Sequence, residues 1–400
     1  EKDSYCLTME LLYLLLLNLL LASSTLIDDR FEEIHHSVGG DNYGIPTHLP
    51  EDDYESLVSQ QFSKDPYAGK NKIKLIVSGK FKLIDVTMVG NHEVMGSFCE
   101  FYFDETTNIL PRYVDYYSES IHCQEHHVSL PLHKVAEACR KYDSTGTSKM
   151  MSMEPDGFIL HQPKSGSTLL SNILAVSSRV IAEPSALGDI LLCENNCDTN
   201  LRIRALQDAM YLLGRRRTTT SMQQKFFVKI SYYHTNGLPL LRETFPDANW
   251  LYLYRQNDVV LQKLMNSKYD RRYCSRHRFH PEKQLVNYLN KGDASSLTVE
   301  EACAAHFASQ MTMIKNELDN KGRIVEYNEL LRNKSIVQLL NYLEVPIVHW
   351  DKIQEQRTKK ANGQQQGEEW MDESELFLSK EVTDATSRFN FDWEDYKSMY

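Results

Sequence analysis

The sequence predicts an α/β fold: a central, mainly parallel sheet flanked by helices, with a small β-rich unit in front of it. From Gly157 onward, short apolar strands alternate with helical segments, the pattern of βαβ units. Before that point, residues 71–130 are rich in β-branched and aromatic residues divided by glycine turns. The 400-residue length and 42% hydrophobic composition allow two or three domains with a sizeable core.

The chain begins with an apolar segment of the targeting type. Residues 11–27 read LLYLLLLNLLLASSTLI, in which small residues suited to cleavage follow the apolar run. The run is short for a membrane span, which needs about 20 residues. We expect residues 1–27 to be a signal peptide, with a membrane-holding signal anchor as the alternative. Either one predicts the secretory pathway, meaning the Golgi lumen, the Golgi membrane or secretion, where the sequon at 333–335 would be usable.

The remaining segments follow in order. Residues 28–70 are acidic and polar, as in a stem or linker. The β-rich unit contains three expected strands, in KIKLIVSG, FKLIDVTMVG and SFCEFYF. Residues 131–350 open with a helix and continue as the α/β domain. Residues 351–400 are expected to be a polar linker and a C-terminal helix.

Cysteine usage fits an oxidising compartment. The chain has eight cysteines. The spacing in CENNC allows a small loop closed by Cys193 and Cys197. One further bridge is expected among Cys99, Cys123 and Cys139.

The most informative segment is a polar turn between an apolar strand and a helix. In GFILHQPKSGSTLLSNILA, residues 157–175, the turn consists of Pro163, Lys164, Ser165, Gly166, Ser167 and Thr168. Backbone N–H groups at a helix start bind anions, the lysine adds positive charge, and the hydroxyls add donors. Glycine lets the backbone approach an oxyanion closely. The turn therefore predicts phosphate or sulfate recognition, the alternative being an ordinary turn capped by Ser or Thr.

The turn is not a Walker A loop, because its lysine precedes the glycine instead of following the second glycine of G-x-x-x-x-G-K-[ST]. The order PKSGST after a strand resembles the 5′-phosphosulfate loop of the sulfotransferase family. FPDANWLYLYRQNDVV, residues 245–260, resembles the family's 3′-phosphate segment, and residues 322–346 resemble the end of its core. The three elements occur in the family's order over roughly residues 131–350.

The resemblance implies a P-loop sulfotransferase-like fold and the donor 3′-phosphoadenosine 5′-phosphosulfate. Lys164 and the backbone of 165–168 would hold the 5′-phosphosulfate, and Arg255 the 3′-phosphate. Lys164 would also neutralise charge developing on the bridging oxygen. Where the family usually has a serine as a second 3′-phosphate ligand, this chain has Lys263, which either binds phosphate in its place or marks a member that has lost activity.

Sulfuryl transfer to a hydroxyl needs a base, for which there are two candidates. Glu183, in RVIAEPSALGDIL, stands at a position that resembles the E-P loop of secretory-pathway sulfotransferases, where a glutamate acts as the base. His234, in VKISYYHTNG, lies near the catalytic histidine of cytosolic members, although its register is shifted. We rank Glu183 first. The alternatives are a helix-initiating carboxylate and an ordinary loop histidine.

Other clusters carry weaker signals. RRYCSRHRFH, residues 271–280, is the densest basic cluster and either lines an anion site or is a solvated face. HCQEHH, residues 122–127, has zinc-like residue types but no second ligand pair nearby, so we expect no metal. The formal charge of −11 argues against a nucleic-acid partner.

The sequence thus predicts a sulfotransferase that acts on a hydroxyl of a carbohydrate or of a protein tyrosine. A non-catalytic secreted binding protein that retains the fold is one alternative. A P-loop kinase or nucleotide hydrolase is the other.

Overall fold

The computed structural model describes residues 72–90, 92–100, 109–110, 123, 127–145, 148–193, 197–217, 225–290, 292–358 and 378–389. The chain divides into two compact units, Glu1–Ala68 and Gly69–Tyr400, and every described residue belongs to the second. The expected targeting segment and acidic stem lie outside the described residues, as do most of HCQEHH and most of the expected polar linker. Within the described ranges, no helix is both long enough and apolar enough to cross a membrane.

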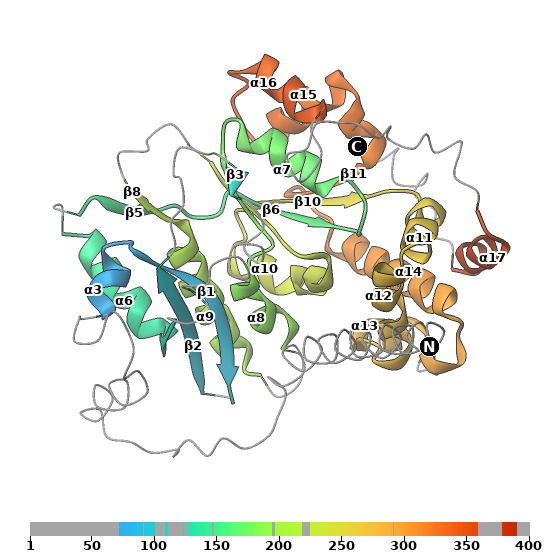
Figure 1. Ribbon diagram of the computed structural model, residues 1–400, viewed down its shortest axis with the longest axis horizontal. Helices are drawn as coiled ribbons and strands as arrows, with labels where there is room; N and C mark the ends of the chain where they lie inside the picture. The colour runs from blue at the N-terminus through green and yellow to red at the C-terminus, as the bar shows by residue number, and fades with distance from the viewer. Residues whose placement is uncertain are drawn as a thin grey trace, which may run out of the picture. The chain divides into compact units, whose positions relative to one another are not determined.

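A six-stranded sheet forms the centre of this unit (Figure 1). Its strands lie in the order β11, β10, β6, β9, β7, β3, and each neighbouring pair is parallel. The strands are β3 (Ile109–Leu110), β6 (Gly157–His161), β7 (Arg179–Ala182), β9 (Phe226–Lys229), β10 (Asn249–Tyr254) and β11 (Gly322–Glu326). The predicted α/β fold with a mainly parallel sheet is confirmed.

Both faces of the sheet are covered by helices. Leu251 and Leu253 of β10 belong to an apolar core shared with α7 (Ser167–Ala175), α15 (Asn333–Tyr342) and α16 (Trp350–Thr358). Alternate side chains of a strand point to opposite faces, so the buried Trp250 and Tyr252 lie on the other face. Figure 1 shows α10 (Leu238–Thr244) on that side. This two-sided burial explains why the strands read as continuous apolar runs.

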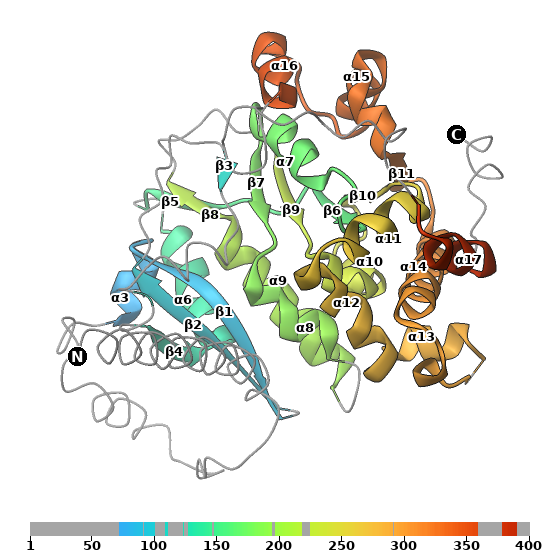
Figure 2. The same ribbon diagram turned by 45° about the vertical axis from the view of Figure 1, so that its right-hand side comes forward.

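The N-terminal part of the unit is an antiparallel sheet of three strands in the order β1, β2, β4 (Figure 2). These strands are β1 (Phe81–Val89), β2 (Glu93–Glu100) and β4 (Val128–Pro131), and α6 (Leu132–Asp143) follows. A second, two-stranded antiparallel sheet pairs β5 (Met150–Ser152) with β8 (Arg215–Arg217).

One expected strand of this region is wrong: KIKLIV forms the helix α3 (Lys72–Val77). Its β-branched residues favour a strand locally, but a distant contact stabilises the helix. The Arg215 guanidinium donates to the backbone oxygens of Ile76 and Val77 at 3.0 and 2.7 Å. These carbonyls, at the end of the helix, have no partner within it. The local sequence does not reveal a partner so far along the chain.

The remaining elements are mostly helical. Four helices pack around one apolar core: α11 (Asn257–Met265), α12 (Lys268–Phe279), α14 (Val299–Glu317) and α17 (Lys380–Arg388). The other described helices are α8 (Gly188–Leu192), α9 (Thr199–Gly214) and α13 (Lys283–Tyr288). Short 3₁₀ turns occupy η2 (Ser185–Leu187), η3 (Tyr232–Gly237), η4 (Ala294–Ser296) and η5 (Tyr327–Leu331).

Three disulfides join described residues. Cys193–Cys197 closes the expected small loop, and Cys99–Cys123 is the bridge among the three candidates, which leaves Cys139 as a buried free thiol. The third pair, Cys274–Cys303, joins α12 to α14. Three disulfides are typical of a secreted or lumenal protein.

Candidate functional site

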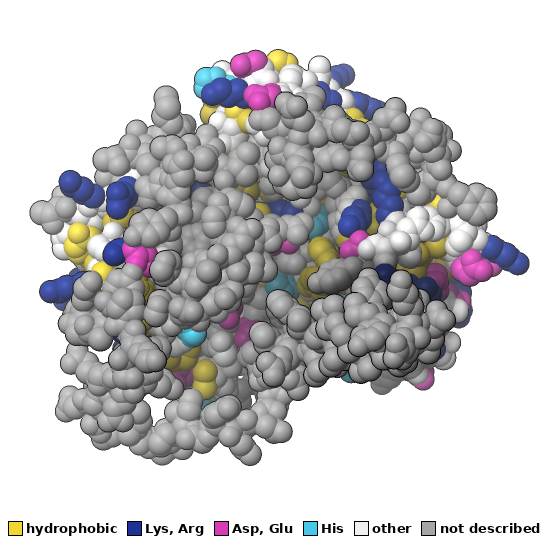
Figure 3. Space-filling model, in the orientation of Figure 1, with side chains coloured by type: hydrophobic (Ala, Val, Ile, Leu, Met, Phe, Trp, Pro, Cys, Tyr) yellow, Lys and Arg dark blue, Asp and Glu magenta, His cyan; other side chains and the backbone are white. Residues whose placement is uncertain are grey.

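The site lies where the parallel strands of the central sheet end. Strands β6, β9 and β7 are neighbours, and their last residues lead into the β6–α7 loop, η3 and the Glu183 loop. In open α/β sheets, ligands bind in the crevice beyond the carboxyl ends of the strands. Figure 3 shows several Lys and Arg side chains close to acidic and histidine side chains in the part of the view that is not grey.

The β6–α7 loop has a constrained backbone. Lys164 and Gly166 have positive φ angles of 59° and 85°. A Cβ at Gly166 would lie 2.6 Å from the Tyr327 ring, so there is no room for a side chain. The buried Ser165 hydroxyl donates to the backbone oxygen of Gln162 at 2.7 Å and holds the turn closed. Because this hydroxyl is already engaged, Ser165 would contact a ligand through its backbone and not through its side chain.

Helix α7 starts directly after this loop. Gly166 is its N-cap residue, and no side chain caps the helix. The first N–H groups of a helix have no partner within it and carry partial positive charge. Ser167 and Thr168 stand in this first turn, where the sequence predicts anion recognition. An uncapped helix start behind a glycine with no space for a side chain suits a phosphate or sulfate group.

Lys164 is already paired with a carboxylate. Its ammonium lies 2.9 Å from the Asp270 carboxylate on α12, and the lysine side chain is 47% exposed. An anion bound at the loop would compete with Asp270 for this ammonium. Nothing in the local sequence relates Asp270 to the loop, because α12 reaches it only through the fold.

Two ionic side chains face each other at the ends of β9 and β7. Lys229 is the last residue of β9, is 2% exposed, and places its Nζ 2.5 Å from Glu183 Oε1. The backbone N–H of Glu183 donates to the Lys229 carbonyl at 2.7 Å, and Glu183 has a left-handed φ of 51°. A non-glycine residue in this region is strained, so the surrounding structure fixes its position. Lys229 Nζ also lies 3.5 Å from Thr168 Oγ1, which connects the pair to the start of α7.

His161, the last residue of β6, completes the group. Its Nε2 lies 3.6 Å from Glu183 Oε1, beyond hydrogen-bond range, so the contact with Lys229 is the stronger one. Burial would raise the pKa of Glu183, but His161 and Lys229 outweigh it and hold that pKa well below its usual range. Burial, followed by the Lys229 charge, lowers the pKa of His161. At neutral pH the group is therefore an ionised carboxylate, an ammonium and a neutral imidazole.

Arg255 directly follows β10 and is buried. Its guanidinium lies over the Tyr327 ring, 4.2 Å from the centroid, as in a cation–π contact. Its backbone N–H donates to Gln162 Oε1 at 3.2 Å, and Gln162 Nε2 donates to Asn257 Oδ1 at 3.0 Å. Gln162 thus ties the β6–α7 loop to the turn after β10. The two segments expected to hold the ends of one nucleotide are neighbours in the structure.

The other two predicted residues, Lys263 and His234, come from α11 and η3. Lys263 is half-buried on α11, the helix that begins after Arg255. His234 lies in η3, and a Cβ at Gly188 would approach its Cε1 to 3.2 Å. Burial lowers the pKa of His234 to about 4, so its ring is neutral at pH 7.

The comparisons with known proteins are distant. No protein-family model matches the chain, and neither does any curated protein. Solved structures similar to it include sulfotransferase STF1 from Mycobacterium tuberculosis, at 11% identity and a TM-score of 0.37, over 65% of this chain and 81% of that one. Sulfotransferase STF9 from Mycobacterium avium matches at 13% identity and a TM-score of 0.36, over 62% and 77%. A sulfotransferase domain from the curacin biosynthetic pathway matches at 13% and 0.32, over 60% and 99%.

These identities and TM-scores are too low to assign a function by similarity. A function must therefore be inferred from the residues of the site. Turn composition indicated the loop, and the family resemblance indicated Arg255 and Glu183. They missed Asp270, Gln162 and Tyr327, whose contacts arise from the order of the strands and the position of α12.

Proposed function

We propose that this protein is a sulfotransferase that moves a sulfuryl group from 3′-phosphoadenosine 5′-phosphosulfate to a hydroxyl of a carbohydrate or a protein tyrosine. The observation that carries the proposal is the buried Lys229–Glu183 pair beside the start of α7. It brings a carboxylate base and a cation to the loop whose sequence, PKSGST, resembles a 5′-phosphosulfate loop.

The residues present fit this donor. The uncapped start of α7, with no space for a side chain at Gly166, would hold the 5′-phosphosulfate together with Lys164. Arg255 would hold the 3′-phosphate, for which a guanidinium fork suits the geometry. Lys263, one helix further, is proposed as the second 3′-phosphate ligand in place of the serine usual in the family.

The chemistry is an in-line displacement. The donor supplies a sulfuryl group whose bond to the phosphate oxygen breaks as the acceptor oxygen attacks sulfur. Glu183 takes the proton of the acceptor hydroxyl, and Lys164 neutralises charge on the departing oxygen. His234 is the second candidate base, and its lowered pKa leaves it neutral and able to accept a proton.

Lys229 has two roles in this scheme. In the unliganded protein it neutralises Glu183 and makes that carboxylate a weak base. An anion at the start of α7 would draw the ammonium toward itself, because Lys229 Nζ already lies 3.5 Å from Thr168 Oγ1. Glu183 then loses its strongest partner and becomes more basic when the donor is in place. The base is thereby activated by the arrival of the donor.

The proposed setting is the secretory pathway, in the Golgi or outside the cell. The three disulfides support an oxidising compartment. The N-terminal apolar segment would deliver the chain there as a signal peptide or hold it at the membrane as an anchor. The proposed acceptor is a hydroxyl of a carbohydrate or of a protein, and the acidic chain is not expected to bind nucleic acid.

Thermal unfolding of the protein with 3′-phosphoadenosine 5′-phosphate, and separately with Mg-ATP, tests the donor site. A ligand at about 100 times its dissociation constant stabilises by roughly 2.7 kcal/mol. We expect a shift with the first ligand only, lost in Lys164→Ala and Arg255→Ala and kept in the control Lys149→Ala, an exposed lysine on another segment. A shift with Mg-ATP only would support a kinase or nucleotide hydrolase, and no shift with either would overturn the proposal.

A further inference from the structure

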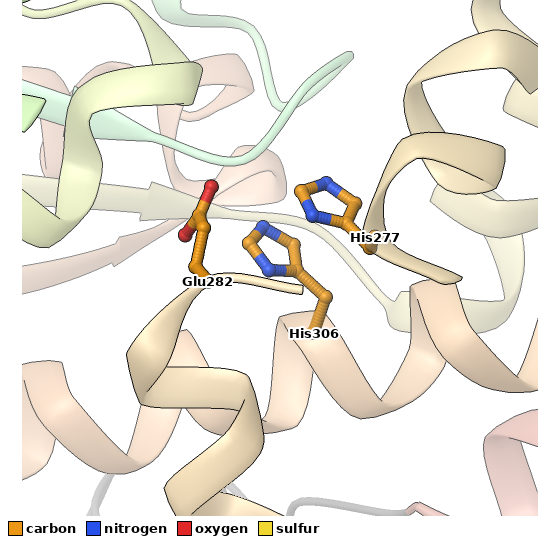
Figure 4. A group of neighbouring side chains, drawn as sticks. All are labelled: His277, Glu282 and His306. Atoms are coloured by element: carbon orange, nitrogen blue, oxygen red, sulfur yellow. The ribbon is translucent and has the colours of Figure 1, made fainter. Parts of the chain in front are cut away.

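Two buried histidines and a glutamate lie together among the helices α12, α13 and α14, and the proposed transfer uses none of the three. His277 comes from α12, His306 from α14, and Glu282 is the N-cap residue of α13 (Figure 4). One ligand atom from each side chain lies within 4.8 Å of the others. Figure 4 shows the two imidazole rings side by side, with the carboxylate next to the ring of His306.

The two rings are buried with unmet hydrogen-bonding groups. Each histidine is 1% exposed. Both ring nitrogens of His277 and Nδ1 of His306 are buried without a hydrogen-bond partner. The rings stack with centroids 3.5 Å apart and planes 12° apart. Buried polar atoms are normally paired, and an unpaired one carries its full desolvation penalty, so three in one cluster need an explanation.

A bound cation would explain them. Each buried ring has a nitrogen with no hydrogen-bond partner, and an imidazole nitrogen of this kind can give its lone pair to a metal. Imidazole and carboxylate ligands suit zinc, and two histidines with a glutamate are a known zinc ligand set. The negative charge of Glu282 would attract a bound cation. The positive charge of Arg276, which lies beside His277 in the sequence, would repel it.

The neighbours of these side chains match the support that metal ligands usually have. His306 Nε2 lies 2.9 Å from the Tyr273 hydroxyl, an arrangement that leaves Nδ1 for a metal. The Asn236 amide donates to Glu282 Oε2 and so orients the carboxylate. Bound ligands at about 2.0–2.2 Å from zinc can be no more than about 4 Å apart. The side chains must therefore close in by roughly 1 Å on binding, and the two stacked rings must turn so that their in-plane lone pairs converge on one ion.

A covalent link stabilises the same helix pair. Cys274 and His277 are three residues apart on α12, and Cys303 and His306 are three residues apart on α14. Residues at this spacing lie on one helix face, so the Cys274–Cys303 disulfide and the two histidines occupy successive levels of the same interface. The disulfide fixes the separation of the helices that present both rings.

We propose that His277, Glu282 and His306 bind one divalent transition-metal ion, for which zinc is the best match. The site is distinct from the sulfuryl-transfer residues, and its role is to fix α12 to α14 and to the start of α13. Because α12 also carries Asp270, the metal would hold the partner of Lys164 in place. The sequence did not indicate this site, because the ligands are spread over two helices and a connecting turn.

Metal content tests this inference without any activity measurement. The protein is stripped with a chelator, incubated with zinc chloride, separated from free metal and analysed for zinc per chain. We expect one tightly retained zinc ion in the wild type, at most a tenth of that in His277→Gln and His306→Gln, and full retention in the control His280→Gln. His280 lies directly after α12 and is exposed, so it matches His277 in residue type and neighbourhood.

Two further measurements keep the test decisive. Glu282 is half-buried, and Glu282→Gln preserves the shape of its side chain. This variant therefore tests zinc binding even if a histidine variant fails to fold. We expect it to weaken zinc retention at least tenfold. Zinc should also raise the unfolding temperature of the wild type and of His280→Gln, and magnesium should not. Equal zinc retention in His277→Gln and His280→Gln, or no retained zinc in the wild type, would overturn the proposal.

Discussion

Lys229 Nζ and Glu183 Oε1 lie 2.5 Å apart at the ends of two neighbouring parallel strands. Removing one partner of such a buried pair leaves an uncompensated charge and costs about 3–5 kcal/mol. We expect Lys229→Met to lower the free energy of unfolding by about 3 kcal/mol, measured by urea denaturation. Lys229→Met combined with Glu183→Gln should be more stable than Lys229→Met alone. If the effects of the two substitutions on the free energy of unfolding are additive, Lys229 and Glu183 do not interact energetically.

Glu183 is the first candidate for the base. We expect Glu183→Gln to lower kcat by roughly 10²–10⁴-fold, the usual contribution of a general base. Its affinity for 3′-phosphoadenosine 5′-phosphate should stay within a few-fold of the wild type, because the residue does not hold the nucleotide in the scheme. His234→Gln is the matched comparison. A larger loss of kcat in His234→Gln than in Glu183→Gln would identify His234, and not Glu183, as the base.

Gly166 has no space for a side chain. A Cβ there would lie 2.6 Å from the Tyr327 ring at a φ of 85°, whereas a Cβ at Gly90, with a φ of 61°, would meet nothing within 4 Å. Backbone strain alone costs about 1–2 kcal/mol in the left-handed region. We therefore expect Gly90→Ala to destabilise by about 1 kcal/mol and Gly166→Ala by roughly 1–2 kcal/mol more. Nucleotide binding should fall in Gly166→Ala only, and equal effects of the two changes would contradict the close packing of the loop.

The lowered pKa of His234 makes stability depend on pH. The folded state binds this proton with a pKa of about 4, and the unfolded state with a pKa of about 6.5, so the unfolded state takes up more protons between those values. Stability is therefore full above about pH 6.5 and falls as the pH drops toward 4. From pH 7 to 4.5, His234 should contribute a loss on the order of 2 kcal/mol. Urea denaturation of His234→Gln should show a shallower pH dependence, and an unchanged slope would mean that the ring is not buried as described.

Local patterns predict part of the candidate site. The strand, turn and helix around Lys164 follow from hydrophobic periodicity and turn composition, whereas Arg255 was indicated by the resemblance of residues 245–260 to the 3′-phosphate segment of the sulfotransferase family. The Lys229–Glu183 contact was not predictable in this way, because it depends on β9 lying beside β7. The position of Asp270 beside Lys164 depends in the same way on the packing of α12.

The errors and omissions have the same cause. KIKLIV has the composition of a strand, and the distant Arg215 guanidinium helps to satisfy the carbonyls that end the helix it forms. The Cys274–Cys303 bridge and the nearby His277 and His306 become neighbours only when α12 packs on α14. Residue types in sequence order carry no signal for such pairs.

An assay of sulfuryl transfer tests the proposed function most directly. The protein is incubated with sulfur-labelled 3′-phosphoadenosine 5′-phosphosulfate and a panel of tyrosine peptides and glycans, beside Glu183→Gln and the control Lys149→Ala. We expect labelled acceptor in at least one class with the wild type and Lys149→Ala, and at least 100-fold less with Glu183→Gln. A wild type that binds the donor but transfers no label to any acceptor would rule out the proposed sulfotransferase and indicate a binding protein that retains the fold.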